Sequence, residues 1–181
     1  DILKVAESNP AMVDPEYSDG CGYTALFLAV EQGNLKAVQF LIERLGYNTH
    51  AKAFYDKSLL HVACENGHKD VARYLFDKGA PINNVTKRNV TPFGECCRNG
   101  HLETAKMLQE AGADITIDDS NESNLKAAAI AGHLDMVEYL IEKRGIERDI
   151  LNAIYFIDNI DIIKVLIKSG ADVNCQDEEG C

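Results

Sequence analysis

Basic side chains are scarce in this chain of 181 residues. Its 18 lysines and arginines stand against 29 aspartates and glutamates, which gives a formal net charge of −11. Proteins that bind nucleic acids neutralise phosphates with basic side chains, and anionic membrane surfaces attract the same side chains. The shortage of cations therefore argues against a nucleic-acid partner and against docking on an anionic membrane.

Proline and long hydrophobic runs are also scarce. The chain contains four prolines and no low-complexity tract, while 46% of its residues are hydrophobic and 26% are charged. This composition is typical of an ordered soluble protein. No apolar run approaches the roughly 20 residues that a membrane helix needs, and no secretory signal is recognisable. We expect an intracellular protein, in the cytoplasm or alternatively the nucleus, with no membrane insertion.

A repeated pattern organises most of the chain. Four glycines stand 34, 33 and 32 residues apart: Gly33, Gly67, Gly100 and Gly132. Nine residues before each glycine lies a hydroxyl residue: Thr24, Ser58, Thr91 and Ser123. Apolar residues follow each glycine at helical spacing. The pattern predicts two short helices per unit, with the hydroxyl as the N-cap of the first helix and a left-handed glycine between the two.

The units are expected to stack, because helices of this length cannot bury their apolar faces alone. Four clear units begin near residues 19, 53, 86 and 118. A fifth unit is divergent and carries Asp158 where the glycine should be. The fourth unit lacks most of its exit loop, so that segment 143–146 is predicted to turn directly into the fifth unit.

The units resemble the ankyrin-repeat family. The match is close in the opening Asp19–Leu26, in the segment Ser58–Ala63, at the turn Asn99–His101 and in the exit Gly170–Asn174. The resemblance implies an all-α fold, an α-solenoid of stacked ankyrin repeats with projecting hairpin loops. It divides one ankyrin-repeat domain, 1–181, into the end of a preceding repeat (1–18), five repeats (19–52, 53–85, 86–117, 118–146 and 147–176) and the start of a truncated sixth (177–181). Both ends suggest a fragment of a longer ankyrin-repeat protein.

Residues with catalytic or metal-binding potential have simpler explanations. His61, Cys64 and His68 have a spacing that could align metal ligands on one helix. The resemblance instead implies a structural role for His61, which bonds backbone between units in relatives, and puts His68 at the turn. Asp56, Ser58 and His61 include the residue types of a hydrolase triad, but Ser58 is better explained as a helix cap. We expect no catalytic residue, no metal and no cofactor.

The six cysteines form no Cys-x-x-Cys pair and lack the dense spacing of a disulfide scaffold. Reduced thiols are therefore expected. The adjacent Cys96 and Cys97 fall on small residues of a predicted first helix, where a free cysteine acts as a small hydrophobe.

The resemblance also implies a partner-binding surface, because hairpin tips and first helices form a concave groove in this family. The predicted partner-binding residues are Tyr23, Phe54, Tyr55, Lys57, Lys87, Arg88, Arg98, Ile130 and Phe156. Further groove positions at the tips are Cys21, Val90, Asp119, Ser120 and Glu122. Those on the first helices are Leu28, Glu31, Gln32, Val62, Glu65, Asn66, Glu95, Asn99, Ala127, Ala131, Ala153 and Ile157. The tips grade from aromatic through basic to acidic, so that Lys57, Lys87 and Arg88 are expected to make the middle of the groove positive.

Two aromatic residues at one tip give the sharpest expectation. Phe54 and Tyr55 have no core to fill in a plain ankyrin unit, and an exposed apolar patch is typical of an interaction site. The alternative is that Phe54 folds back against a neighbouring hairpin. A second apolar patch is predicted from Ile130, Phe156 and Ile157, unless the shortened loop brings Phe156 or Tyr155 into the core.

The function expected from these features is a non-catalytic protein–protein interaction module of an intracellular scaffold, adaptor or regulator. Its partner would be a protein, with no nucleic acid and no small-molecule substrate. The alternative is a regulatory or substrate-recruiting ankyrin segment of a larger enzyme, ubiquitin-ligase subunit, channel or injected bacterial effector.

Overall fold

The computed structural model describes most of the repeat region. The described residues are 24–120, 122–146, 150 and 154–171. The predicted end segments 1–18 and 177–181, the predicted binding residue Tyr23, and the predicted groove positions Cys21 and Ala153 lie outside this part of the chain.

The helices follow one another in pairs. The first helices of the pairs are α2 (Ala25–Glu31), α4 (Leu59–Glu65), α6 (Pro92–Asn99) and α8 (Asn124–Ile130). The second helices are α3 (Leu35–Leu45), α5 (Lys69–Asp77), α7 (Leu102–Glu110) and α9 (Leu134–Arg144). Towards the C-terminus, the short 3-10 helix η3 (Ile154–Phe156) precedes α11 (Ile160–Lys168).

One small sheet projects from the helices. Strand β1 (Lys52–Ala53) pairs antiparallel with β2 (Lys57–Ser58), so that Lys52 faces Ser58 and Ala53 faces Lys57. The 3-10 turn η2 (Phe54–Asp56) joins the two strands. This hairpin therefore carries both predicted aromatic residues at its end.

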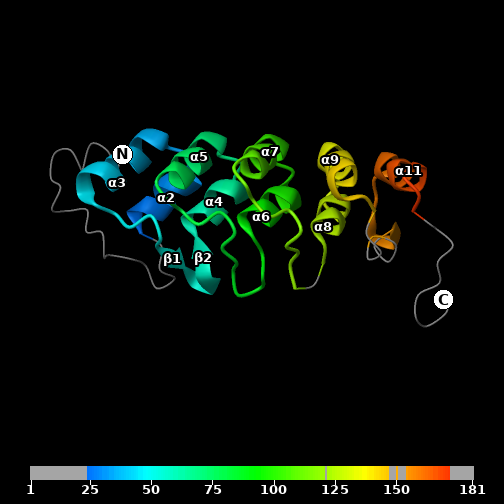
Figure 1. Ribbon diagram of the computed structural model, residues 1–181, viewed down its shortest axis with the longest axis horizontal. Helices are drawn as coiled ribbons and strands as arrows, with labels where there is room; N and C mark the ends of the chain where they lie inside the picture. The colour runs from blue at the N-terminus through cyan, green and yellow to red at the C-terminus, as the bar shows by residue number, and fades with distance from the viewer. Residues whose placement is uncertain (1–23, 121, 147–149, 151–153, 172–181) are drawn as a thin grey trace.

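The pairs stack into an elongated array, as Figure 1 shows. Helix α4 contacts both α2 and α6, and α6 contacts α8, so the first helices form one row. The second helices form the other row, in which α5 contacts α3 and α7. The hairpin β1–β2 and the loops that follow it project from the row of first helices. The arrangement confirms the predicted all-α solenoid.

Hydroxyl side chains cap three of the four first helices, as predicted. The side chains of Ser58, Thr91 and Ser123 each accept a hydrogen bond from a backbone amide of the first turn of α4, α6 and α8. The prediction is wrong for Thr24, whose side chain makes no cap bond to α2. The Thr24 hydroxyl oxygen is buried and has no hydrogen-bond partner among the described residues, although its backbone is extended like that of the other caps.

The glycines between paired helices adopt the predicted left-handed conformation. Their φ angles are 65° at Gly33, 70° at Gly67, 72° at Gly100 and 83° at Gly132. Three histidines then link each unit to the one before it through Nε2 and a backbone carbonyl: His68 with Glu31, His101 with Glu65 and His133 with Arg98. Each of these rings lies against the glycine of the preceding unit, so a side chain there would collide with it.

Small residues let the first helices approach one another. Ala29, Ala63, Cys96 and Ala128 occupy the equivalent positions, and each is at most 2% exposed. Larger side chains of both rows, including Leu60, complete one continuous core. This packing holds the hairpins at fixed positions along one side of the array.

Candidate functional site

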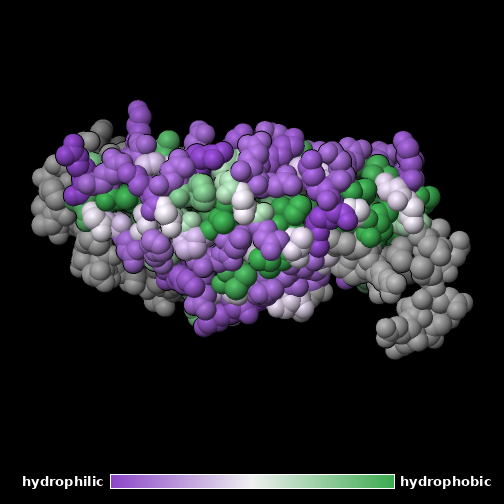
Figure 2. All heavy atoms as spheres, in the orientation of Figure 1, coloured by the Kyte–Doolittle hydropathy of each residue, from purple (hydrophilic) through white to green (hydrophobic). Residues whose placement is uncertain are grey.

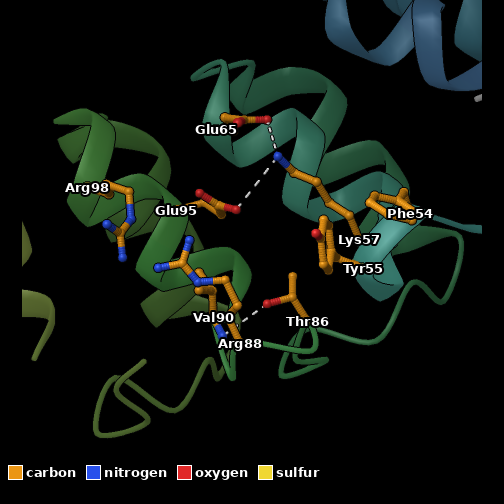
Figure 3. Close-up of a pocket in the computed structure, with 9 residues that line it drawn as sticks. All are labelled: Phe54, Tyr55, Lys57, Glu65, Thr86, Arg88, Val90, Glu95 and Arg98. Carbon is orange, nitrogen blue, oxygen red and sulfur yellow. Dashed lines mark hydrogen bonds and ion pairs between the residues drawn. The ribbon is translucent and has the colours of Figure 1, made fainter. Parts of the chain in front are cut away.

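A cleft of about 440 Å³ lies between the hairpin β1–β2 and helix α6 (Figure 3). It is lined by Phe54, Tyr55, Lys57, Glu65, Thr86, Arg88, Val90, Glu95 and Arg98. The cleft therefore brings together five of the predicted binding residues: Phe54, Tyr55, Lys57, Arg88 and Arg98. Thr86 is a lining residue that the repeat pattern did not indicate, because it lies in the irregular loop before α6.

Two exposed rings form one wall of the cleft. Phe54 is 59% exposed and Tyr55 is 55% exposed. Their ring centroids lie 4.2 Å apart in an edge-to-face arrangement, a favourable geometry for aromatic pairs. Phe54 is therefore not covered by a neighbouring hairpin, and the pair presents its apolar surface to solvent.

The backbone at this tip is strained. Tyr55 has φ 60° and ψ 26°, in the left-handed region that non-glycine residues seldom occupy. The neighbouring Asp56 has φ 61°, and Asn89 in the next loop has φ 65°. Aspartate and asparagine tolerate this conformation better than a bulky residue does. Tyr55 is therefore the costly residue at this tip.

Lys57 lies inside the cleft and is held by two carboxylates. Its Nζ donates to Glu65 Oε2 and lies 3.8 Å from Glu95 Oε1. Burial raises the pKa of the Glu95 carboxyl, while the nearby Lys57 ammonium acts in the opposite direction. The single charge of Lys57 thus offsets one of these two carboxylates, which corrects the expectation that Lys57 makes the groove positive.

The acidic fourth loop is likewise compensated from within the chain. Arg98 forms ion pairs of 2.7 Å with both Asp119 and Glu122. Arg144 binds both carboxylate oxygens of Asp118, at 2.9 and 3.0 Å. The sequence predicted that the tips change from basic to acidic along the array. Ion pairs between neighbouring units largely remove this difference in charge.

Backbone hydrogen bonds connect successive loops. The Lys87 amide donates to the Tyr55 carbonyl at 2.9 Å, and the Ser120 amide and hydroxyl both donate to the Arg88 carbonyl. Val90, which was expected at a tip, is instead buried, and its carbonyl lies 3.0 Å from His61 Nε2. The loops therefore form a continuous strip in which each is fixed to the next.

Two predicted cations remain available to solvent. The side chains of Lys87 and Arg88 are exposed and form no ion pair with any residue that the structure describes. Arg88 lines the cleft, whereas Lys87 lies next to it on the same loop. Of the three residues expected to make the groove positive, these two retain that role.

The second predicted apolar patch is incomplete. Ile130 is 40% exposed and Phe156 is 68% exposed, so Phe156 is not drawn into the core. Ile157 is 5% exposed, and its assignment to the patch was wrong. Figure 2 shows that hydrophilic side chains cover most of the face it presents, with hydrophobic atoms in separate patches between them.

His61 is fully engaged in structural hydrogen bonds. Its Nδ1 accepts from the Ser58 amide and lies 2.6 Å from the Ser58 hydroxyl, while Nε2 donates to the Val90 carbonyl. The neutral ring with a proton on Nε2 satisfies all of these partners. The Ser58 oxygen is directed at the first turn of its own helix, so the pair holds the hairpin rather than forming a nucleophile and base.

The stability of the chain is expected to fall as the pH is lowered from about 6.5 to about 4. Burial lowers the pKa of His61 from 6.5 to about 4, whereas a histidine in the unfolded chain takes up a proton near 6.5. The unfolded state therefore binds more protons in this range, and the free energy of unfolding should fall by up to about 3 kcal/mol.

Urea denaturation at a series of pH values measures this effect. The His61→Gln variant should lose the slope between pH 6.5 and 4, whereas His50→Gln, at an exposed histidine, should keep it. A parent profile that matches the His61→Gln profile in this interval would contradict the assignment.

Helix pairs that stack through a left-handed glycine turn, with hairpins along one side, define a repeat protein of the ankyrin class. The family model described as ankyrin repeats (3 copies) matches residues 2–86 and 81–152, and a model of the single ankyrin repeat matches 153–178. The chain belongs to the ankyrin-repeat family. Such repeats generally bind other proteins and are generally not enzymes.

Curated relatives include proteins with different names and lengths. The chain is 31% identical over 85 residues to "Protein fem-1 homolog A-like" of Mus musculus, which covers 47% of this chain and 13% of that protein. It is 41% identical over 59 residues to "Protein phosphatase 1 regulatory subunit 27" of Homo sapiens, covering 33% and 38%. It is 24% identical over 152 residues to "Ankyrin repeat and KH domain-containing protein mask-1" of Caenorhabditis elegans, covering 80% and 6%. The chain thus spans well under half of each relative.

Among the described residues, no helix is long and apolar enough to cross a membrane.

Proposed function

We propose that the chain is a non-catalytic interaction module that holds a partner protein against the cleft, within an intracellular, cytoplasmic scaffold, adaptor or regulator. The exposed pair Phe54–Tyr55 is the observation that carries the proposal. Two large rings on a projecting hairpin present apolar area that a partner can cover, and aromatic residues often dominate the energy of protein interfaces.

Backbone strain at Tyr55 supports the same surface. A bulky residue in the left-handed conformation costs roughly 1–2 kcal/mol relative to its preferred backbone. Strained residues of this kind cluster at functional sites. Asn89 occupies the same conformation in the next loop with a residue type that tolerates it, so the backbone of the turn does not require a tyrosine.

Replacing Tyr55 with asparagine is expected to separate stability from binding. The Tyr55→Asn variant should be as stable as the parent or up to about 1 kcal/mol more stable, because the strain is relieved. Partner binding should weaken by about 30-fold or more, as expected for an interface hot spot worth about 2 kcal/mol. Urea denaturation and capture of partners from a cell extract, quantified by mass spectrometry, measure the two effects.

Asp56→Asn is the matched control, because Asp56 has the same left-handed backbone and does not line the cleft. It should leave capture unchanged. If a folded Tyr55→Asn variant captures the same proteins as the parent and to the same extent, the cleft is not the binding surface.

A second candidate function is a regulatory or substrate-recruiting segment of a larger protein. It is favoured by the short fraction of each relative that the chain spans, 13% and 38% for the first two, and by the relative named as a phosphatase regulatory subunit. Size-exclusion chromatography of the chain mixed with purified protein phosphatase 1 tests one version of this candidate. Separate elution of the two proteins would count against it.

A further inference from the structure

The cleft contains one cation without a counter-charge. Its charged lining residues are Lys57, Glu65, Arg88, Glu95 and Arg98. Lys57 pairs with both glutamates, and Arg98 pairs with two acidic side chains of the following loop. Arg88 is exposed and makes no ion pair within the described part of the chain. The cleft therefore offers a positive charge to a ligand at one position.

Arg88 is held opposite the aromatic pair. Its carbonyl accepts from the amide and hydroxyl of Ser120, and the preceding residue, Lys87, donates its amide to the Tyr55 carbonyl. Figure 3 shows Arg88 on one side of the cleft and Phe54 and Tyr55 on the other. The backbone of Arg88 is thus fixed relative to the hairpin that carries the two rings.

This combination favours an acidic ligand with an adjacent apolar group. A guanidinium binds a carboxylate through two parallel hydrogen bonds, and exposed rings favour contact with apolar side chains. The exposed ammonium of Lys87 adds positive charge beside the cleft. The overall charge of −11 opposes an acidic ligand only weakly, because charges beyond about 8 Å are screened at physiological ionic strength.

A basic ligand fits the same cleft less well. It would have to bind Glu65 or Glu95, which share the single ammonium of Lys57, and Glu95 is only 9% exposed. The Lys57 side chain is only 19% exposed, so displacing it from its carboxylates would leave a poorly hydrated cation without a partner. Removing one member of such a pair is costly.

We propose that the cleft binds an extended acidic segment of a partner protein, with an aspartate or glutamate carboxylate on Arg88 and an adjacent apolar side chain on Phe54 and Tyr55. This inference rests on the proposed function, since it specifies the partner of the same surface. It makes Arg88 the residue that determines the charge of the ligand.

Selection of short random peptides displayed on phage, with the full chain as target, tests the proposal without assuming a ligand. Enriched peptides should contain aspartate or glutamate next to an aromatic or aliphatic residue. Measured by fluorescence polarisation, their affinity should fall about tenfold or more in Arg88→Glu. Selection against Arg88→Glu should enrich lysine or arginine instead. Lys36→Glu makes the same charge change on α3, outside the cleft, and should have no effect.

The outcomes distinguish this inference from the proposed function. Enriched peptides that are basic or uncharged, yet lose binding in Tyr55→Asn, would overturn the acidic ligand and leave the cleft as the binding surface. Acidic peptides that bind Arg88→Glu as well as they bind the parent would also overturn it. Peptides insensitive to both variants, or a selection with no enrichment, would contradict the proposed function as well.

Discussion

Replacing Gly67 with alanine is expected to destabilise the chain by about 2–5 kcal/mol. The left-handed backbone of Gly67, with φ 70°, costs a non-glycine residue about 1–2 kcal/mol. An added Cβ would also lie 2.5 Å from His101 Nδ1, and overpacking of this kind costs about 1–3 kcal/mol. It would disturb the bond between His101 and the Glu65 carbonyl, which joins two units.

Gly79→Ala is the matched control, because Gly79 has φ 88° and nothing within 4 Å of an added Cβ. It should show the backbone cost alone, about 1–2 kcal/mol. Urea denaturation measures how much free energy of unfolding each variant loses. In a chain that already carries His101→Ala, Gly67→Ala should cost less, because the collision with the ring is absent. Equal losses at Gly67 and Gly79 would show that the histidine contact is unimportant.

Replacing Leu60 with alanine is expected to lower the free energy of unfolding by about 2–5 kcal/mol. The Leu60 side chain is 0% exposed in α4, and α4 contacts the first helices on both sides. The cavity therefore weakens two interfaces between units. Since Glu65 is on the same helix and Lys57 lies on strand β2 just before its N-cap Ser58, the cleft should lose its binding activity together with the fold.

Leu28→Ala provides the comparison, because Leu28 is 40% exposed in the equivalent helix α2. The Leu28→Ala substitution should lower the free energy of unfolding by less than about 1 kcal/mol, because the Leu28 side chain buries less apolar area than the Leu60 side chain does. Far-ultraviolet circular dichroism during urea denaturation measures both. A Leu60→Ala variant as stable as Leu28→Ala would mean that the core at α4 can close around the cavity.

Local spacing was sufficient to predict the architecture. A hydroxyl residue nine positions before a glycine, with apolar residues at helical intervals, defines the helix pair within one unit, and Ser58 and Gly67 behave as predicted. The resemblance to ankyrin repeats, rather than the spacing alone, placed Phe54 and Tyr55 at a hairpin tip, where both are exposed. These features depend on residues that are close in the sequence, or on the repetition of the unit.

Charge pairing between units could not be predicted in the same way. Lys57 contacts Glu95 across 38 positions of the sequence, and Arg98 contacts Asp119 across 21. These pairs depend on how far one loop lies from the next helix, which a repeat pattern does not specify. Phe156 and Ile157 show a similar limit, because these neighbours, at the end of η3 and just after it, are 68% and 5% exposed.

His68, His101 and His133 each bond the preceding unit, so the interfaces that contain these histidines should be stronger than an interface without one. In the next unit, Asn159 stands where the earlier units have the linking histidine. Its side chain accepts hydrogen bonds from the amides of Asp161 and Ile162 in the first turn of α11, within its own unit. In an array with nearest-neighbour coupling, opening begins at the weakest interface. Amide hydrogen exchange should therefore be fastest from α11 inwards, and the segment that carries the cleft should persist as the last cooperative block.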